Sequence, residues 1–382
     1  MITETVTYLI TLPESWQRMS KLPLYKSVVI GEDSYHVKGA LDMLAGSTDV
    51  TRAWYKGQNV ASVQLRGGGV VKSLHQFDRH GHTEETFLSL MEECQRHGVE
   101  RPASYSSVFH EKFKSPRVSF SVNKYFADEF AGGWQEAIEP GMHQQHLRKY
   151  DLNSAYLWAG SQGLPNVSRG LDYSEQIKPN GLYLLEIVPK IGTPFPFCRT
   201  RLVVAEAEDV ETYSLEVLRV VGGVTWGSGV SGQQIIDTVQ RFSFWKQIGR
   251  SYWGRWASNR KVRCRTFDYF GDVRKEWELG NPFRNYVWAT IIVNRVKRRL
   301  FTSGVKMLHV FVDSIITPGI LPINEKIGGW KLEKEYPTGL KILGTGWYGV
   351  PGQKPEKHVG MSLEEHRQEW PRHVKVGVAL GE

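Results

Sequence analysis

The stretch that decides the fold of this chain is LRKYDLNSAYLWAG, residues 147–160. Its first half is typical of a short buried β-strand, yet it contains the carboxylate of Asp151. An unpaired charge in a protein interior is strongly destabilising, so this group must be exposed, paired or bound to a metal ion. Ser154 and Tyr156 follow closely, so polar groups gather where the expected strand ends.

The composition indicates a folded, basic protein. The 382 residues include 48 Lys plus Arg against 40 Asp plus Glu, and this net charge of +8 favours a polyanionic partner. The 13 Trp offer stacking surfaces for bases, although most aromatic rings belong to cores. Cys94, Cys198 and Cys264 form neither a zinc-ligand spacing nor a disulfide framework. No signal peptide or apolar span is evident, so we expect a soluble, cytoplasmic protein with no membrane partner.

Periodicity along the chain predicts a mixture of strands and helices. Strands are expected at 60–68, around 70–71, and at 147–152, 181–189 and 200–207. Helices are expected at 84–98 (ending at Gly98), 233–257, 284–301 and near 362–369. The glycines of FAGGWQEAIEPG, 130–141, predict a turn or a close backbone approach.

The run VKMLHVFVDSIITPG, 305–319, predicts a hairpin with Asp313 at or near its tip. Asp151 and Asp313 then each end a β-rich apolar run. Either one alone is explained as a solvated turn residue, but on one sheet the two could bind divalent cations through oxygen ligands. Such two-metal sites activate an attacking hydroxyl and stabilise a leaving oxygen.

The expected helix 233–257 carries a second cluster. Ile235, Val239, Phe242 and Trp245 form its apolar stripe. Lys246, Arg250 and Trp253, at spacings of four and three, share one face and could bind a triphosphate and cover a base. The alternative is a solvated basic face with one incidental ring.

Three segments, in this order, resemble the motifs of family B DNA polymerases. DLNSAY (151–156) resembles motif A, KQIGRSYWG (246–254) motif B, and FVDSI (311–315) motif C. FAGGW (130–134) resembles the glycine turn of the protein-primed branch, and NPFRNYVWATIIVNRVKRRL, KIGGWKLEKEY and KHVGMS resemble its later elements. The resemblance covers roughly residues 126–365.

The resemblance implies roles for individual residues. Asp151 and Asp313 would be the catalytic residues and the ligands of two Mg²⁺ or Mn²⁺ ions, and Tyr156 would exclude a 2′-hydroxyl. The nucleotide would contact Leu152, Ser154, Lys246, Arg250, Ser251, Trp253 and Gly254. The glycine turn, Gly132 and Gly133, would contact the template strand. Independently of the resemblance, the charge of the basic helix (Arg295, Lys297, Arg298 and Arg299) predicts contact with a phosphate backbone, and Lys331 is a candidate for the primer strand. A solubilising end of the basic helix is the alternative for its cations.

The sequence also departs from the family pattern. Arg250 and Trp253 replace the usual Asn and Tyr of motif B, and Phe311 replaces the first Asp of motif C. No Lys occurs in GTGWYGV (344–350), so Lys331 or Lys341 would have to bind the primer strand in its place. Asp42 is followed by Met43 and Leu44 instead of the second carboxylate of a 3′–5′ exonuclease, which predicts no proofreading. The alternative recruits carboxylates from elsewhere, such as Asp78 or Glu84.

We therefore expect an α+β right-hand polymerase with an antiparallel palm sheet, reduced helical fingers and a small thumb. The segments would be an N-terminal α/β module resembling a degenerate exonuclease (1–125), palm (126–230 and 284–345), fingers (231–283) and a small thumb (346–382). The short intervals between motifs leave little room for the insertions of the protein-primed branch. The expected partners are template and primer DNA and dNTPs, with a terminal protein, single-strand-binding protein or helicase as further candidates, in a phage- or plasmid-carrying host. A primase or terminal transferase, and a non-catalytic DNA-binding or priming accessory, remain the alternatives.

Overall fold

The chain divides into two compact units, each built from two stretches of sequence. The first comprises Met1–Ser115 and Asp237–Arg284, and the second Pro116–Ile236 and Asn285–Glu382. The computed structural model describes residues 6–10, 28–30, 33–37, 50–56, 59–66, 70–73, 84–99, 104–113, 118–168, 171–190, 192–195, 202–258, 262–268, 272–279 and 283–351. The helix expected near 362–369 lies outside these residues, as do Asp42, Asp78 and Cys198. None of the described helices combines the length and apolarity needed to span a bilayer.

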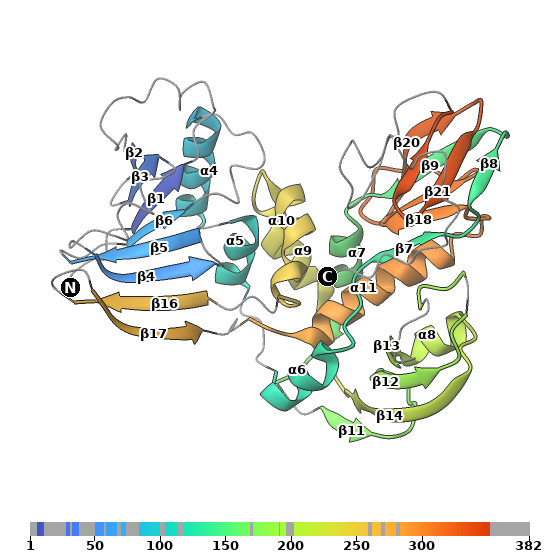
Figure 1. The fold of residues 1–382 in the computed structure, drawn as a ribbon, viewed down its shortest axis with the longest axis horizontal. Helices are drawn as coiled ribbons and strands as arrows, with labels where there is room; N and C mark the ends of the chain where they lie inside the picture. Colours follow the sequence, from blue (N-terminus) through green and yellow to red (C-terminus); the bar gives the residue numbers. More distant parts are fainter. Residues whose placement is uncertain are drawn as a thin grey trace. The chain divides into compact units, whose positions relative to one another are not determined.

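The first unit contains an eight-stranded mixed sheet (Figure 1). Its order is β17-β16-β4-β5-β6-β1-β3-β2, and β1 runs parallel to both of its neighbours while the other pairs are antiparallel. The strands are β1 Val6–Ile10, β2 Val28–Ile30, β3 Asp33–Val37, β4 Val50–Lys56, β5 Asn59–Leu65, β6 Val70–Ser73, β16 Val262–Phe267 and β17 Val273–Leu279. Strands β5 and β6 confirm the two that alternation predicted in this region.

The helices of the first unit are short. They are α4 Glu84–Arg96, α5 Tyr105–Lys112, α10 Trp245–Ser251 and the 3₁₀ turn η1 Trp253–Arg255. Helix α4 confirms the prediction for 84–98, and Gly98 follows it at φ +64°, the left-handed conformation that ends many helices. Helix α10 packs against α5, where a ring nitrogen of His110 lies 2.9 Å from the carbonyl of Tyr252.

The single helix predicted for 233–257 is wrong. Helix α9 (Gly232–Gln240) ends before Ser243, and α10 begins at Trp245. The backbone N–H and hydroxyl of Ser243 donate to Glu93 of α4 instead of continuing the helix. Ile235, Val239 and Phe242 are buried as the apolar stripe predicted, but they belong to two segments and not to one helix.

The segment expected as helical fingers, 231–283, also contains a β-hairpin. Strands β16 and β17 pair with each other, and β16 adds to the N-terminal strand β4. The segment is therefore not all helical.

The second unit is built around a five-stranded antiparallel sheet with the order β20-β9-β19-β18-β7. The strands are β7 Trp134–Ala137, β9 Leu147–Leu152, β18 His309–Val312, β19 Ser314–Thr317 and β20 Trp330–Tyr336. Strand β9 and the hairpin β18–β19 confirm two predictions. The helices of this unit are α6 Phe120–Ala127, α7 Ala155–Ser161, α8 Ala207–Thr212 and α11 Tyr286–Phe301, the last confirming the helix expected at 284–301.

Three smaller sheets complete the second unit. A four-stranded antiparallel sheet, β11-β14-β12-β13, follows α7 in the chain and includes the two strands expected at 181–189 and 200–207. A three-stranded sheet, β22-β21-β8, and the pair β10-β15 are the other two. Their strands are β8 Gly141–His143, β10 Leu164–Pro165, β11 Asp172–Ser174, β12 Gly181–Ile187, β13 Leu202–Glu206, β14 Val217–Thr225, β15 Gly229–Val230, β21 Leu340–Gly344 and β22 Trp347–Gly349.

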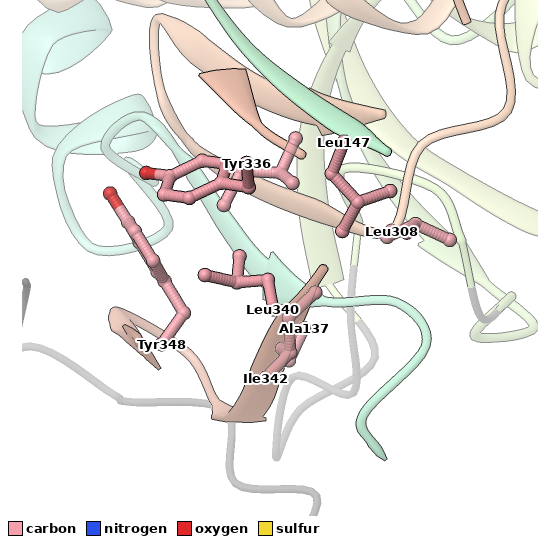
Figure 2. Packing of buried hydrophobic residues seen from close by; sticks show 8 residues of the cluster. Ala137, Leu147, Leu308, Tyr336, Leu340, Ile342 and Tyr348 are labelled. Atoms are coloured by element: carbon pink, nitrogen blue, oxygen red, sulfur yellow. The ribbon is translucent and has the colours of Figure 1, made fainter. Parts of the chain in front are cut away.

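An apolar cluster joins the five-stranded sheet to the three-stranded one (Figure 2). Its side chains come from the two sheets and from the residue before β18, so burying them stabilises the sheet end distant from Asp151. The members are Ala137, Leu147, Leu308, Ile316, Tyr336, Leu340, Ile342 and Tyr348. Because each is no more than 8% exposed, this end of the sheet is firmly packed, and the opposite end can carry polar groups.

Candidate active site

Asp151 and Asp313 lie side by side at one end of the five-stranded sheet. Asp151 is the penultimate residue of β9, and Asp313 is in the turn between β18 and β19. The N–H of Leu152 donates to the carbonyl of Asp313 at 2.9 Å, so the backbones that carry the two carboxylates are in direct contact. Both residues are only partly buried. The prediction that Asp151 and Asp313 lie together on one sheet is therefore confirmed for their backbones.

The backbone next to each aspartate is strained. Val312, immediately before Asp313, has φ +63°, and Ser154, three residues after Asp151, has φ +52°. The left-handed region is unfavourable for any residue with a Cβ and most unfavourable for a β-branched one such as Val. Such strain persists only where the surrounding structure enforces it, and it concentrates at functional sites.

A row of side chains crosses the sheet at the level of Asp151. Directly paired residues of neighbouring antiparallel strands share a face, so the register Gln135–Phe311–Ser314–Asp151–Lys331 puts all five on one face. Phe311 therefore occupies this face where the motif-C pattern has a carboxylate. Lys331 lies next to Asp151 on the outer strand β20, and its side chain is exposed.

Tyr156 closes the site from the first turn of α7. Its side chain is 8% exposed. The pKa of Tyr156 is raised, by burial first and then by the carboxylates of Asp313 and Asp151, so the hydroxyl stays protonated at neutral pH. That both carboxylates influence it shows that the phenol lies close to the pair.

Gly133 approaches the same point from the turn before β7. A Cβ at this position would lie 3.0 Å from Val312 Cγ1, 3.2 Å from Val312 Cα and 3.4 Å from the Tyr156 hydroxyl. The same atom built on Gly132 meets nothing within 4 Å. The close backbone approach predicted for the glycine pair is thus confirmed for Gly133 and not for its neighbour.

The loop between Asp151 and α7 is fixed by a second segment, 325–329. The N–H of Asn153 donates to Gly329 at 2.8 Å, and the carbonyl of Asn153 accepts from Gly328 at 2.7 Å. The Asn153 side-chain amide donates to the carbonyls of Glu325 and Lys326. This anchor was not anticipated from the sequence, although the paired glycines were a signal of a close backbone approach.

Arg295 of α11 supports α7 from within the fold. Its guanidinium donates to the carbonyl of Ala159 at 3.1 Å and also to that of Gly163, at the C-terminal end of α7. A cation in this position satisfies free carbonyls and is favoured by the helix dipole. The expected contact of Arg295 with nucleic acid is not supported by this arrangement, because the guanidinium is engaged inside the protein.

The expectation that α11 presents an exposed basic end is wrong for Lys297 and Arg298. Their exposed fractions are 2% and 7%. Arg298 pairs with Asp209 at 2.6 Å and with Glu206 at 3.0 Å, both from the β13–α8 region. A backbone phosphate could reach neither side chain without opening this core, and sequence alone could not reveal acids about ninety positions away.

The motif-B-like residues belong to the first unit. Lys246 and Arg250 are exposed on α10, Ser251 ends that helix, and Trp253 and Gly254 lie in η1. The common helical face predicted for Lys246, Arg250 and Trp253 is therefore interrupted between its second and third members. The contacts of these residues with a nucleotide remain predictions.

The donor set at the strand ends fits a hard cation. Mg²⁺ prefers carboxylate oxygens and commonly uses only one or two of them, with water and substrate phosphates completing its shell. Within the part of the chain that the structure describes, no three His, Cys, Asp or Glu side chains gather as a ready-made metal site. Asp151 and Asp313 would supply the carboxylate ligands, with water and substrate oxygens as the others that Mg²⁺ commonly uses.

Comparison with known proteins finds similarity in structure only. No protein-family model and no curated protein matches the sequence. Phi29 DNA polymerase complexed with primer-template DNA, in the post-translocation binary complex, aligns with a TM-score of 0.57 at 13% identity, over 93% of this chain and 82% of that one. The same polymerase complexed with single-stranded DNA gives 0.55 at 15% identity, over 82% and 75%. Its ternary complex with incoming nucleotide gives 0.54 at 13% identity, over 84% and 78%. Identities this low show a shared fold alone.

Proposed function

We propose that this chain is a template-directed DNA polymerase that adds dNTPs to a 3′-hydroxyl. The observation that carries the proposal is the contact between the strand ends of Asp151 and Asp313, with Tyr156 closing over the pair. The likeness in fold to Phi29 DNA polymerase supports it, because the two proteins align over most of both chains. The ordered motif-like segments support the protein-primed branch of family B in particular.

In this proposal Asp151 and Asp313 would be the protein ligands of two Mg²⁺ or Mn²⁺ ions. Bound ions of this kind lower the pKa of an attacking hydroxyl and neutralise charge on the phosphates. The chain's own contribution is positioning: the 3′-hydroxyl attacks the α-phosphate in line, and pyrophosphate leaves. The strained residue Val312 and the anchored residue Asn153 hold the two carboxylates at a fixed separation.

Tyr156 is the proposed filter for the sugar. The Tyr156 ring is buried and its hydroxyl lies close to Gly133, so the ring has little freedom to move. A 2′-hydroxyl on a nucleotide stacked against this ring would clash with it. The backbone of Leu152 and Ser154, between the end of β9 and the start of α7, is proposed to bind the triphosphate. Lys246 and Arg250 are proposed to neutralise that triphosphate.

Nucleic-acid contacts are proposed for Gly132, Gly133 and Lys331, which are partly or fully exposed. The partners would be template and primer DNA, with a terminal protein, single-strand-binding protein or helicase as further candidates. Proofreading is proposed to be absent, because the sequence around Asp42 lacks the second carboxylate of an exonuclease site.

The test is incorporation of labelled dNTPs on a primed template with Mg²⁺ or Mn²⁺. Asp151→Asn and Asp313→Asn should each lower the rate by at least a hundredfold, whereas Asp172→Asn, which removes an exposed carboxylate of β11, should not. Wild-type rates in both active-site variants would refute catalysis at this pair. No incorporation by the wild-type protein itself would instead favour a non-catalytic DNA-binding or priming accessory.

Omitting the primer separates the second enzymatic alternative. A polymerase that extends a 3′-hydroxyl requires the primer, so wild-type protein should give no product on template alone. Product formed without a primer, or without a template, would instead indicate a primase or a terminal transferase.

A further inference from the structure

The first unit carries a sheet face on which aromatic and basic side chains alternate. The register places Trp54, Cys264 and Trp277 in one row across β4, β16 and β17, and Arg52, Thr266 and Lys275 in the next row. Because alternate residues of a strand share a face, both rows lie on the same face of the sheet. We call this surface, Arg52, Trp54, Lys275 and Trp277, the aromatic-basic face.

This face is partly open to solvent, although Cys264 at its centre is completely buried, and the opposite face of β4 and β5 is core. Ala53 and Val63, whose side chains point to the other side, are completely buried. On the aromatic-basic face Arg52, Trp54 and Trp277 are half-buried, and Lys275 is exposed. Strand β17, which carries Lys275 and Trp277, is an edge strand of the sheet (Figure 1), and Trp54 lies two strands further in.

The cations are held against the rings. The Arg52 guanidinium lies 5.7 Å from the centroid of the Trp54 ring and 5.8 Å from that of Trp277. It is therefore placed between the two rings that flank Cys264. The Lys275 ammonium lies 5.7 Å from the Trp277 centroid. Neither cation forms an ion pair with any residue that the structure describes, and the buried Nε of Arg52 has no hydrogen-bond partner there.

The acids of β17 lie on the opposite face, which also carries the cations Arg265 and Arg274. Glu276 and Glu278 alternate with Lys275 and Trp277 along β17, so both acids point to the other side. There Glu276 is paired with Arg265, which also lies 5.1 Å from the Tyr55 ring. The aromatic-basic face therefore combines half-buried rings with cations that pair with no acid among the described residues.

We propose that this face binds single-stranded nucleic acid. Bases can stack on the Trp rings or on the guanidinium plane, while Lys275 and Arg52 neutralise phosphates. Two strand spacings separate Trp54 from Trp277, about 9–10 Å, a distance that an extended strand covers within a few nucleotides. Duplex DNA cannot use the rings, because its bases are already stacked and paired.

The proposal does not rest on nucleotidyl transfer and is tested without it. Anisotropy of fluorescein-labelled dT20 and rU20 is measured in EDTA and without dNTPs, so no catalytic step contributes. Trp277→Ala should weaken binding about tenfold, whereas Trp277→Phe, which keeps a ring, should stay within about threefold of wild type. If Trp277→Ala weakens binding of only one of the two probes, dT20 or rU20, that type of nucleic acid is the ligand of this face.

Charge variants supply the matched control. Lys275→Gln should lower the slope of log affinity against log salt by about 0.7, the value for one lost phosphate contact to a single strand. Arg265→Gln removes the same charge from the opposite face of the hairpin and should leave that slope unchanged. Circular dichroism and thermal unfolding confirm that each variant is folded.

Three outcomes overturn the proposal. They are wild-type affinity of Trp277→Ala for both strands, an unchanged salt slope in Lys275→Gln, and an equal fall in affinity of Trp277→Ala for a 20-base-pair duplex. The proposed active site is judged separately. Loss of incorporation in Asp151→Asn, with unchanged dT20 binding in Trp277→Ala, would support the active site and refute this face.

Discussion

Replacing Gly133 with Ala tests the geometry of the candidate active site directly. The added methyl group would lie 3.0 Å from Val312 Cγ1 and 3.2 Å from Val312 Cα, tighter than nine in ten real Cβ contacts. Val312 precedes Asp313 in a two-residue turn, and Gly133 is next to Trp134, which pairs with Val312 across β7 and β18. The turn therefore has to move by a few tenths of an ångström, and Asp313 has to move with it.

Two readouts follow from this displacement. Overpacking of this kind costs about 1–3 kcal/mol of unfolding free energy, and we expect the lower end because the displaced group is a turn. A misplacement of about 1 Å in a catalytic group can cost roughly a hundredfold in rate, so a few tenths should lower kcat about three- to tenfold. Urea unfolding and single-turnover dNTP incorporation measure the two quantities.

The controls isolate the contact. Gly132→Ala adds the same methyl group one residue away in open space, so the free energy of unfolding should change by less than about 0.5 kcal/mol. Gly227→Ala, also in open space and far along the chain, serves as the control for incorporation. Val312→Gly removes the colliding side chain and allows φ +63° without strain, so in the double variant the cost of Gly133→Ala should fall by at least about 0.5 kcal/mol. Equal stability and rate in Gly133→Ala and both controls would refute the reasoning.

Three further predictions concern single side chains. Tyr156→Val should increase incorporation of ribonucleotides relative to deoxynucleotides, measured as the ratio of kcat/KM, and an unchanged ratio would remove the sugar-filter role. Arg298→Ala should destabilise the second unit by about 3–5 kcal/mol in urea unfolding, because Asp209 and Glu206 lose their buried partner; a change below about 1 kcal/mol would contradict this. Burial lowers the pKa of Lys297 to about 8, so between about pH 8 and 10.5 the folded protein releases a proton that the unfolded chain keeps, and stability should rise with pH. Lys297→Met should remove this rise. If the free energy of unfolding depends on pH in the same way in wild type and Lys297→Met, Lys297 does not cause the rise.

Local pattern was enough to predict the elements that carry the two aspartates. The apolar run before Asp151 and the two β-branched runs around Asp313 specify strands by their own composition, and both are strands here. Helix α11 was equally predictable, because a run that changes from apolar residues to cations suits a helix C-terminus.

Long-range contacts account for what the sequence did not predict. The helix expected at 233–257 is broken because Ser243 bonds to Glu93, which lies 150 positions earlier. The basic end of α11 looked solvated because its acidic partners are distant in sequence and are brought to it only by β13 and α8. The hairpin β16–β17 was not predicted, although β-branched, aromatic and apolar residues recur in VRCRTF and VRKEWEL.

The position of the two carboxylates follows from antiparallel pairing. Asp151 lies where β9 leaves the sheet, and Asp313 lies where the chain turns back into it, so an antiparallel register that aligns Asp151 with Ser314 necessarily brings both to one end. A shift of one residue would turn Asp151 to the other face and exchange it for the apolar Leu152. The buried cluster at the far end of the sheet opposes such a shift, because turning β9 over would take Leu147 out of the cluster. Apolar packing at one end of the sheet thus fixes the register that places the carboxylates at the other.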